Sequence, residues 1–127
     1  MSGPAKHLKQ MNALSLIAAH EAHLAGQPLG RRLVAKGIDL SGLRFAGVQL
    51  RNCVLPGSDL SHSQFIDCDF SLADLFGINA SEADLTRSKF ERADLRGANF
   101  TRAKLQKAVL SKADLRAGVI RRAILTP

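Results

Sequence analysis

From Ile38 to Pro127 the hydrophobic residues recur every five positions. Counting from Leu40 in steps of five, the central residue of each unit is Leu, Phe or Ile, except at Ala80. The residue two positions before each centre is usually small. A helix repeats its apolar face about every 3.6 residues and a strand about every 2, so neither element explains this pattern. A fixed short period over most of a chain predicts a solenoid, in which each repeat is buried by its neighbours.

The segment before the repeats has hydrophobic residues at spacings of three and four. These positions predict an amphipathic helix that ends near Ala25, with an apolar stripe made of Leu8, Met11, Leu14, Ile17, Ala18 and Leu24. The open first coil of a solenoid is the surface that such a stripe would cover. We therefore expect a capping helix and connector over residues 1–37, followed by the repeat domain over residues 38–127.

Several repeat units share the sequence Ala-Asp-Leu or Ala-Asn-Phe: Ala73-Asp74-Leu75, Ala83-Asp84-Leu85, Ala93-Asp94-Leu95, Ala98-Asn99-Phe100 and Ala113-Asp114-Leu115. They resemble the A(D/N)LXX unit of the pentapeptide-repeat family. The segment from His20 to Gly42 also resembles the leader that often precedes such repeats in bacterial members. The resemblance implies an all-β solenoid, a right-handed quadrilateral β-helix with four units to a coil. For this chain it implies about four and a half coils with an N-terminal α-helical cap.

With four units to a coil, side chains twenty residues apart stack in columns at the spacing of neighbouring strands, about 4.8 Å. One inward column is all leucine: Leu55, Leu75, Leu95 and Leu115. Ile78 should return the volume that Ala80 lacks. Pro56-Gly57 fits a type II corner turn, and Gly77, Gly97 and Ala117 continue that corner. The same side stacks Asp74, Asp94 and Asp114 outward, and we expect Arg96 and Arg116 to neutralise this like-charge column.

The net charge of +7 is unevenly distributed along the chain. Residues 1–86 hold 7 Lys and Arg against 8 Asp and Glu, a net −1, whereas residues 87–127 hold 11 against 3, a net +8. Six basic residues form corner columns on three edges, in the pairs Arg87 with Lys107, Arg92 with Lys112, and Arg102 with Arg122. These six residues, which we call the basic belt, either keep the rod soluble or bind an anionic partner. That partner would be an acidic protein, lipid headgroups or nucleic acid.

Two small groups of apolar residues also occupy outward positions. Leu72 and Phe76 flank one corner and are a candidate contact patch, although isolated exposed apolar side chains are common. Val109, Val119 and Ile124 form an apolar collar around the last coil. An open coil end of this kind is a hazard unless covered, so we expect a second copy or a further stretch of chain to bury it.

Few residues are candidates for a catalytic or metal-binding site. His20 and His23 are spaced i, i+3 with no third ligand within reach, so we expect no metal site. Cys53 and Cys68 fall at inward positions on adjacent sides, which favours core packing over a disulfide. A filled rod offers no cleft in which catalytic groups could gather. We therefore expect no enzyme activity, no cofactor and no small-molecule substrate.

These observations favour a non-catalytic scaffold for protein–protein interaction in a bacterial cytoplasm. Its interactions would use the rigid rod surface and the open C-terminal end. The alternative is a peripheral binder of anionic membrane or nucleic acid through the basic C-terminal half. The best-known activity of the family, mimicry of duplex DNA that shields type II topoisomerases from quinolones, requires acidic faces, so the charge disfavours a gyrase modulator. No apolar run reaches the roughly 18 residues of a membrane span, and polar residues interrupt the N-terminal segment, so we expect no secretory signal.

Overall fold

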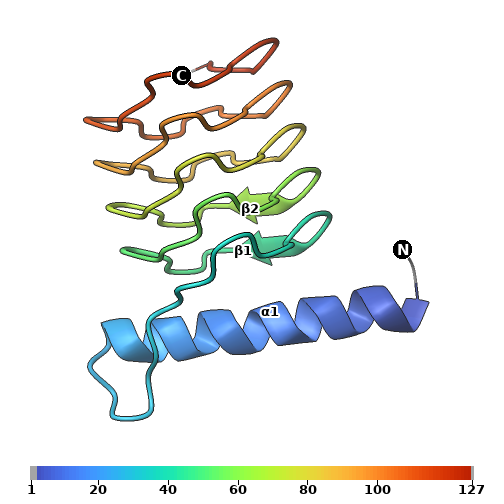
Figure 1. Ribbon diagram of the computed structural model, residues 1–127, viewed down its shortest axis with the longest axis vertical. Helices are drawn as coiled ribbons and strands as arrows, with labels where there is room; N and C mark the ends of the chain where they lie inside the picture. The colour runs from blue at the N-terminus through green and yellow to red at the C-terminus, as the bar shows by residue number, and fades with distance from the viewer. Residues whose placement is uncertain (1–2, 127) are drawn as a thin grey trace.

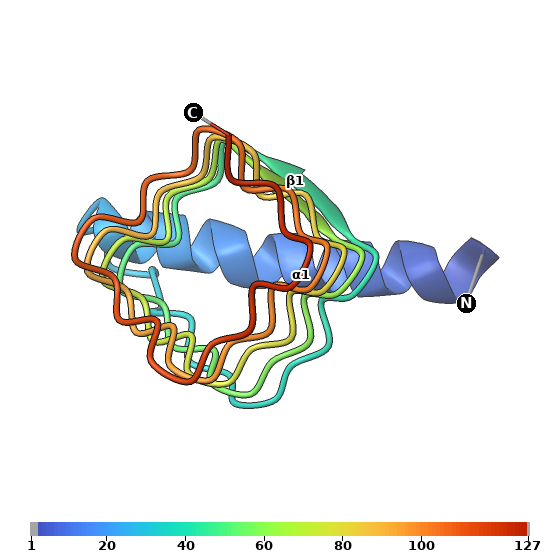
Figure 2. The same cartoon turned by 90° about the horizontal axis from the view of Figure 1, so that it is seen from above.

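The computed structural model describes residues 3–126, which form a stack of four-sided coils above one helix (Figures 1 and 2). Helix α1 (Gly3–Leu24) lies across the open face of the first coil. Strands β1 (Arg44–Ala46) and β2 (Gln64–Ile66) pair in parallel, with Phe45 opposite Phe65. The other sides of the coils are joined by parallel bridges between residues twenty apart, such as Asp74 with Asp94. The chain is therefore a right-handed quadrilateral β-helix with an N-terminal helical cap.

The interior is filled by the residues that the period of five predicts. Every unit centre from Leu40 to Leu105 is buried, and none of them is more than 5% exposed. Phe70 and Phe90 stack with their ring planes 1° apart and their centroids 5.2 Å apart. Ile78 and Ala80 are 1% and 0% exposed, so the larger residue compensates for the smaller within one coil. The predicted inward position of the centres is confirmed over these coils.

Small residues two positions before the centres face the same interior. Three of these residues are serines: Ser63 donates its hydroxyl to the carbonyl of Leu60 in its own coil, and the other two bond to backbone atoms of a neighbouring coil. Ser58 donates to the carbonyl of Ala35 at 3.3 Å and accepts from the amide of Ile38 at 3.1 Å. Ser88 makes the same kind of pair with Phe65 and Cys68. At Ser58 and Ser88 the hydroxyl is therefore tolerated in the interior because it both donates and accepts a hydrogen bond.

In about half of the units an Asp or Asn precedes the centre, and it has a structural role that explains the repeat sequence. Its side-chain oxygen accepts a hydrogen bond from the backbone amide two residues ahead, at the first residue of the corner, as in an Asx turn. At Asn99 the acceptor distance to the amide of Thr101 is 3.0 Å, and the Thr101 hydroxyl donates to the same oxygen at 2.6 Å. The same amide contact is made at Asp39, Asp59, Asp69, Asp74, Asn79, Asp84, Asp94 and Asp114.

The residue two positions after each centre from Leu40 to Ile120 turns the chain and has a positive φ. Gly57 and Gly77 have φ values of 66° and 65°, and Ala117, at the same corner, has 59°. Most of the other corners place a residue with a side chain in this left-handed region, for example Arg92 at 58°. These values fit the second central position of a type II turn, as the sequence predicts.

We expect Gly77→Ala to lower the free energy of unfolding by about 1 kcal/mol, because the left-handed conformation is costly for a residue with a Cβ. The new methyl group would meet no atom within 4 Å, so the loss of stability would report only the cost of the left-handed backbone conformation. Urea denaturation monitored by circular dichroism measures it. Ser111→Ala, at an exposed corner residue without positive φ, is the control. A loss above about 3 kcal/mol at Gly77 would contradict a purely conformational cost.

The face of α1 that covers the β-helix differs from the predicted stripe. The structure buries Ala13, Ile17 and His20, and it leaves Leu8 and Met11 59% and 51% exposed. Leu14 and Leu24 of the predicted stripe are exposed as well. The assignment of the covering face was therefore wrong for most of the stripe.

Polar contacts explain this orientation of α1. Lys9 Nζ lies 3.0 Å from Asp39 Oδ1 and donates to the carbonyl of Ser41 at 2.7 Å. Farther along the helix, a carboxylate oxygen of Glu21 accepts from the amide of Gln49 at 2.9 Å. Lys9, Glu21 and the buried His20 lie on the same side of the helix as Ala13 and Ile17, so hydrogen bonds and not hydrophobicity alone select the covering face. Within residues 3–126, no helix has the length and apolarity needed to cross a membrane.

Candidate interaction surfaces

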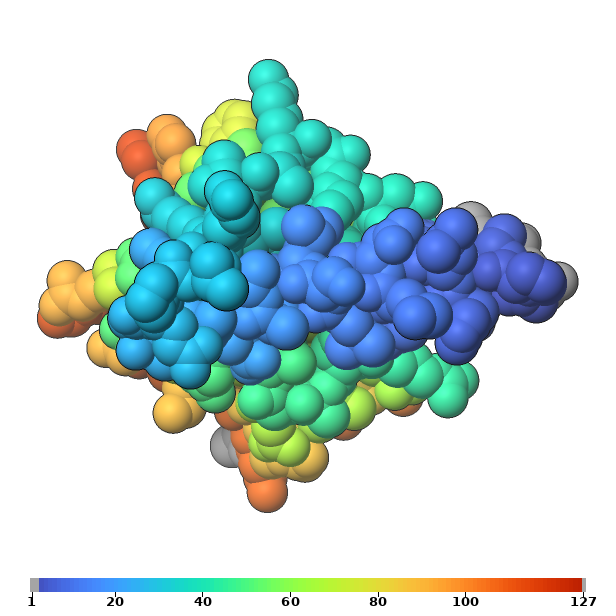
Figure 3. Space-filling view, turned by 90° about the horizontal axis from the view of Figure 1, so that it is seen from below, coloured from blue at the N-terminus to red at the C-terminus, as the bar shows by residue number. Residues whose placement is uncertain are grey.

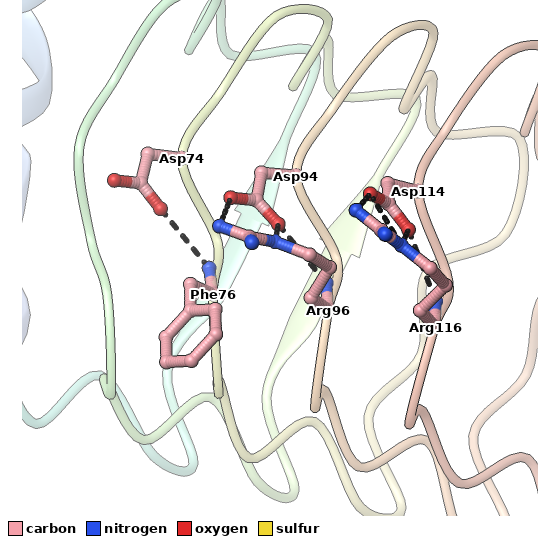
Figure 4. Close-up of polar contacts among 6 residues, drawn as sticks. All are labelled: Asp74, Phe76, Asp94, Arg96, Asp114 and Arg116. Atoms are coloured by element: carbon pink, nitrogen blue, oxygen red, sulfur yellow. Dashed lines mark hydrogen bonds and ion pairs between the residues drawn. The ribbon is translucent and has the colours of Figure 1, made fainter.

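One side of the rod carries a column of three aspartates, of which Asp94 and Asp114 are paired with arginines of their own units and Asp74 accepts from the amide of Phe76 (Figure 4). Arg96 Nη2 lies 2.8 Å from Asp94 Oδ2, and Arg116 Nη2 lies 2.7 Å from Asp114 Oδ2. The Arg96 side chain, which donates hydrogen bonds to Asp94, holds the pKa of that carboxyl below its usual range. The predicted neutralisation of this column is therefore present. Its value for stability is small, because both pairs are largely exposed.

Phe76 occupies the position that Arg96 and Arg116 occupy in the corresponding units of the next two coils. The guanidinium carbon of Arg96 lies 5.2 Å from the centre of the Phe76 ring, which is the geometry of a cation–π contact. Phe76 remains 48% exposed and Leu72 44%. The prediction that these two residues flank one corner is wrong: they lie at successive corners, on either side of the face formed by residues 73–75. Leu72 and Phe76 are therefore two separate exposed apolar side chains and do not form one patch.

The basic belt contains both paired and unpaired charges. Arg87 makes a two-pronged contact with Asp67, with nitrogen–oxygen distances of 2.8 and 3.0 Å, and Arg102 lies 4.0 Å from Glu82. This pairing holds the pKa of Asp67 below its usual range, mainly through the hydrogen bonds from Arg87. In the described part of the chain, the remaining four belt residues are exposed and make no ion pair: Arg92, Lys107, Lys112 and Arg122. The uncompensated charge therefore lies toward the last coils.

The last coil exposes residues that are buried in the coils below it. Leu115 is 37% exposed, whereas Leu75 and Leu95 in the same column are 0% exposed. Ile120 and Leu125 are 51% and 49% exposed. The predicted collar surrounds these centres, with Val109 at 38%, Val119 at 46% and Ile124 at 40%. Unit centres and collar together form one apolar surface, which we call the terminal face.

The terminal face also has unpaired backbone groups. In the lower coils the amide of each centre donates to the coil above, as Leu95 does to the carbonyl of Asp114 at 2.9 Å. Among residues 3–126, no backbone acceptor faces the amides of Leu110, Leu115 and Ile120, nor those of the corner residues Lys112, Ala117 and Arg122. Such a row of groups is a template for the addition of another strand.

One histidine of α1, His20, has a structural role that the sequence did not reveal. His20 is 0% exposed, and its Nδ1 accepts from the amide of Leu33 at 2.8 Å. Its Nε2 lies 2.7 Å from the carbonyl of Arg51, so the neutral ring carries its proton on Nε2. His20 thus joins the helix, the connector and the first coil through one ring. No group of three or more His, Cys, Asp or Glu placed to hold a metal ion occurs within residues 3–126.

Both cysteines are free and buried. Burial raises the pKa of the Cys53 thiol to about 12 and that of Cys68 to about 11. A thiol that remains protonated at neutral pH is a poor nucleophile. Both residues therefore act as core side chains, in agreement with their inward repeat position.

The sequence was compared with models of known protein families, and one of them matches the repeats. A model of pentapeptide repeats matches residues 36–71, 44–79 and 81–116, with 8 copies. The chain is similar to the crystal structure of a pentapeptide repeat protein from the thylakoid lumen of Arabidopsis thaliana, with 26% identity and a TM-score of 0.70. That alignment covers 73% of this chain and 65% of the plant chain, so this chain spans less than two thirds of the plant protein.

Two further solved structures show weaker similarity. HetL, a pentapeptide repeat protein involved in heterocyst differentiation regulation in the cyanobacterium Nostoc sp. strain PCC 7120, has 27% identity and a TM-score of 0.44. Its alignment covers 80% of this chain and 45% of HetL. QnrB1, a plasmid-mediated fluoroquinolone resistance protein, has 21% identity and a TM-score of 0.42, over 69% of this chain and 53% of its own. No curated protein matches the sequence.

Proposed function

The chain belongs to the pentapeptide-repeat family, and we propose that it is a non-catalytic scaffold that binds a protein partner through its terminal face. The observation that carries the proposal is the coincidence of apolar and hydrogen-bonding surface at that face. Exposed Val119, Ile120 and Ile124 surround backbone amides that lack acceptors within the described residues. A protein that presents an apolar coil or strand edge would satisfy both. A second copy stacked end to end is one such partner.

The rigid rod suits this role because its coils are joined by regular backbone bonds along all four sides. A surface that is ordered before binding loses little conformational entropy when it binds. Leu72 and Phe76 would supply secondary contacts on the side of the rod. We place the scaffold in a bacterial cytoplasm, which the resemblance of residues 20–42 to bacterial leaders supports.

The four unpaired charges of the basic belt support a second candidate function, the binding of an anionic membrane or nucleic acid. Arg92, Lys107, Lys112 and Arg122 are exposed and uncompensated, and the last 41 residues carry a net charge of +8. The same sign of charge is unsuited to mimicry of the DNA phosphate backbone. Binding through the belt would weaken steeply as salt rises, whereas docking on the terminal face would not.

We expect the double substitution Val119→Asp and Ile124→Asp to abolish partner capture in a pull-down. The amount of partner captured by the native chain should not change as the salt concentration rises. The matched variant carries Lys107→Glu, Lys112→Glu and Arg122→Glu and should capture the same proteins. Both variants alter exposed outward side chains, and circular dichroism checks that they fold. Light scattering would identify a second copy as the partner.

Two outcomes would contradict the terminal-face proposal. If the native chain and the Val119/Ile124 variant captured identical sets of proteins, the terminal face would not be the docking surface. If only the charge-reversal variant lost binding, and the binding fell with salt, the anionic-partner candidate would replace the proposal.

A further inference from the structure

Helix α1 presents an apolar surface on the side that faces away from the β-helix. Leu8, Met11 and Leu14 are 59%, 51% and 47% exposed, and Ser15 and Ala18 are exposed as well. Seen from below, the helix crosses the base of the rod, with the connector over its C-terminal end and the rest of its outer side uncovered (Figure 3). A helix whose only task was to cap the first coil would keep this side polar.

The exposed residues follow the spacing of a helix–helix seam. Leu8, Met11, Ser15 and Ala18 are separated by three, four and three residues, which is the a/d spacing of a heptad. At about 100° per residue they lie on the side of the helix opposite Ala13 and Ile17, which pack on the first coil. The seam and the capping face therefore do not compete, and a second helix could approach without touching the rod.

Side-chain size changes along the seam in a way that selects one partner. The N-terminal half carries Leu8 and Met11, and the C-terminal half carries Ser15 and Ala18. In an antiparallel pair centred on Ala13, Leu8 of one helix packs on Ala18 of the other, and Met11 packs on Ser15. Each layer then combines one large and one small residue, so the two surfaces interlock with even volume. A parallel pair would place large residues against large ones, and a slip by one heptad would place either Leu8 on Met11 or Ser15 on Ala18, so the layers would no longer have even volume.

Residues beside the seam agree with the same register. Leu14 meets its own equivalent across the two-fold axis, which buries a side chain that is otherwise half exposed. His7 of one copy lies beside Glu21 of the other, whose carboxylate has one oxygen bonded to Gln49 and one available. The antiparallel arrangement also opposes the two helix dipoles. We propose that α1 is a self-complementary interface that joins two copies of this chain as an antiparallel helix pair, with the two rods on opposite sides.

A membrane surface is the other occupant that an apolar helix face suggests. Such a helix needs basic residues along the edges of its apolar face. Here Lys9 is held by Asp39 and Ser41 on the rod side, and the seam is bordered by Asn12, Leu14 and Glu21. The charge pattern therefore favours a second copy.

The test uses the full chain and sedimentation equilibrium over a range of concentrations. We expect a monomer–dimer equilibrium that Ala18→Glu weakens by at least about tenfold, because the new carboxylate would be buried without a partner. Leu16→Glu is the matched control, since Leu16 is 42% exposed on the same helix but off the seam. Val119→Asp with Ile124→Asp should also leave the equilibrium unchanged, which separates this interface from the terminal face.

Cysteine cross-linking tests the register independently. A mixture of Leu8→Cys and Ala18→Cys chains should form a disulfide-linked dimer on mild oxidation, whereas either variant alone should not. The native cysteines are buried and do not interfere. A monomer at all concentrations, cross-linking of Leu8→Cys with itself, or a dimer broken equally by Leu16→Glu would overturn the proposal. Flotation of the native chain with vesicles of anionic lipid, without dimer formation, would assign the face to a membrane instead.

Discussion

Leu75→Ala is expected to lower the free energy of unfolding by about 3 to 4 kcal/mol, whereas Leu115→Ala should cost about 1 kcal/mol or less. The two residues occupy the same column and the same Ala-Asp-Leu sequence, so they differ only in what lies above them. Leu75 is 0% exposed between Leu55 and Leu95, whereas Leu115 is 37% exposed on the terminal face. Removing the Leu75 side chain leaves a cavity that the rigid backbone ladder cannot close.

Urea denaturation at low protein concentration measures both losses, and each variant serves as the control for the other. Equal losses would contradict the assignment of the last coil as open, because they would mean that Leu115 is buried in solution. Repeating the experiment at high concentration extends the test. If a second copy covers the terminal face, the cost of Leu115→Ala should rise with concentration, while that of Leu75→Ala should not.

The repeat geometry could be predicted because the five residues of each unit determine the conformation of that unit. A large residue such as Leu95, a small one two positions earlier and an Asp or Asn between them specify burial, packing and the corner bond within five residues. The spacing of twenty follows once four units form a coil. The ion pair between Asp67 and Arg87 could have been predicted from the same spacing, because the two residues are twenty positions apart. Only the basic residues of that column were named from the sequence, and Asp67 was missed.

What could not be predicted depends on contacts outside one unit. Leu115 has the same local sequence as Leu75, and its exposure is set by the number of coils above it. In α1 the sequence offers two apolar sides, and hydrophobic spacing alone favours the one that includes Leu8 and Met11. The choice is made by Lys9 and His20, whose partners lie in the connector and in the first coil. Such long-range polar contacts have no signature in a hydrophobic pattern.

His20→Ala should lower the free energy of unfolding by about 2 to 4 kcal/mol, because it leaves two buried backbone groups without partners. The amide of Leu33 and the carbonyl of Arg51 would both lose the ring that joins them. The effect should be local as well as global, since this ring attaches α1 and the connector to the coils. Hydrogen exchange should therefore show faster exchange in α1 than in the lower coils. Urea denaturation measures the total loss, and His23→Ala, at an exposed position one turn away, is the control.

The same ring should make stability depend on pH. Burial lowers the pKa of His20 from its ordinary value of 6.5, against a smaller opposing effect of the bond to Arg51, with His23 and Arg32 lowering it further and Glu21 raising it. The folded state therefore resists protonation that the unfolded chain accepts, so this contribution is complete above pH 6.5 and is lost as pH falls below it. Protonation of Nδ1 would also remove the acceptor for the Leu33 amide.

Urea unfolding measured between pH 7.5 and about pH 5 tests this dependence, because the carboxyls with lowered pKa, such as Asp39 at about 2, titrate below that window. The native chain should lose stability across the window, and His20→Gln should start less stable but show a flatter profile. His23→Gln should keep the native slope. If His20→Gln retained the full slope, the proton would be taken up elsewhere, and His20 would not be the group that couples attachment of the cap to pH.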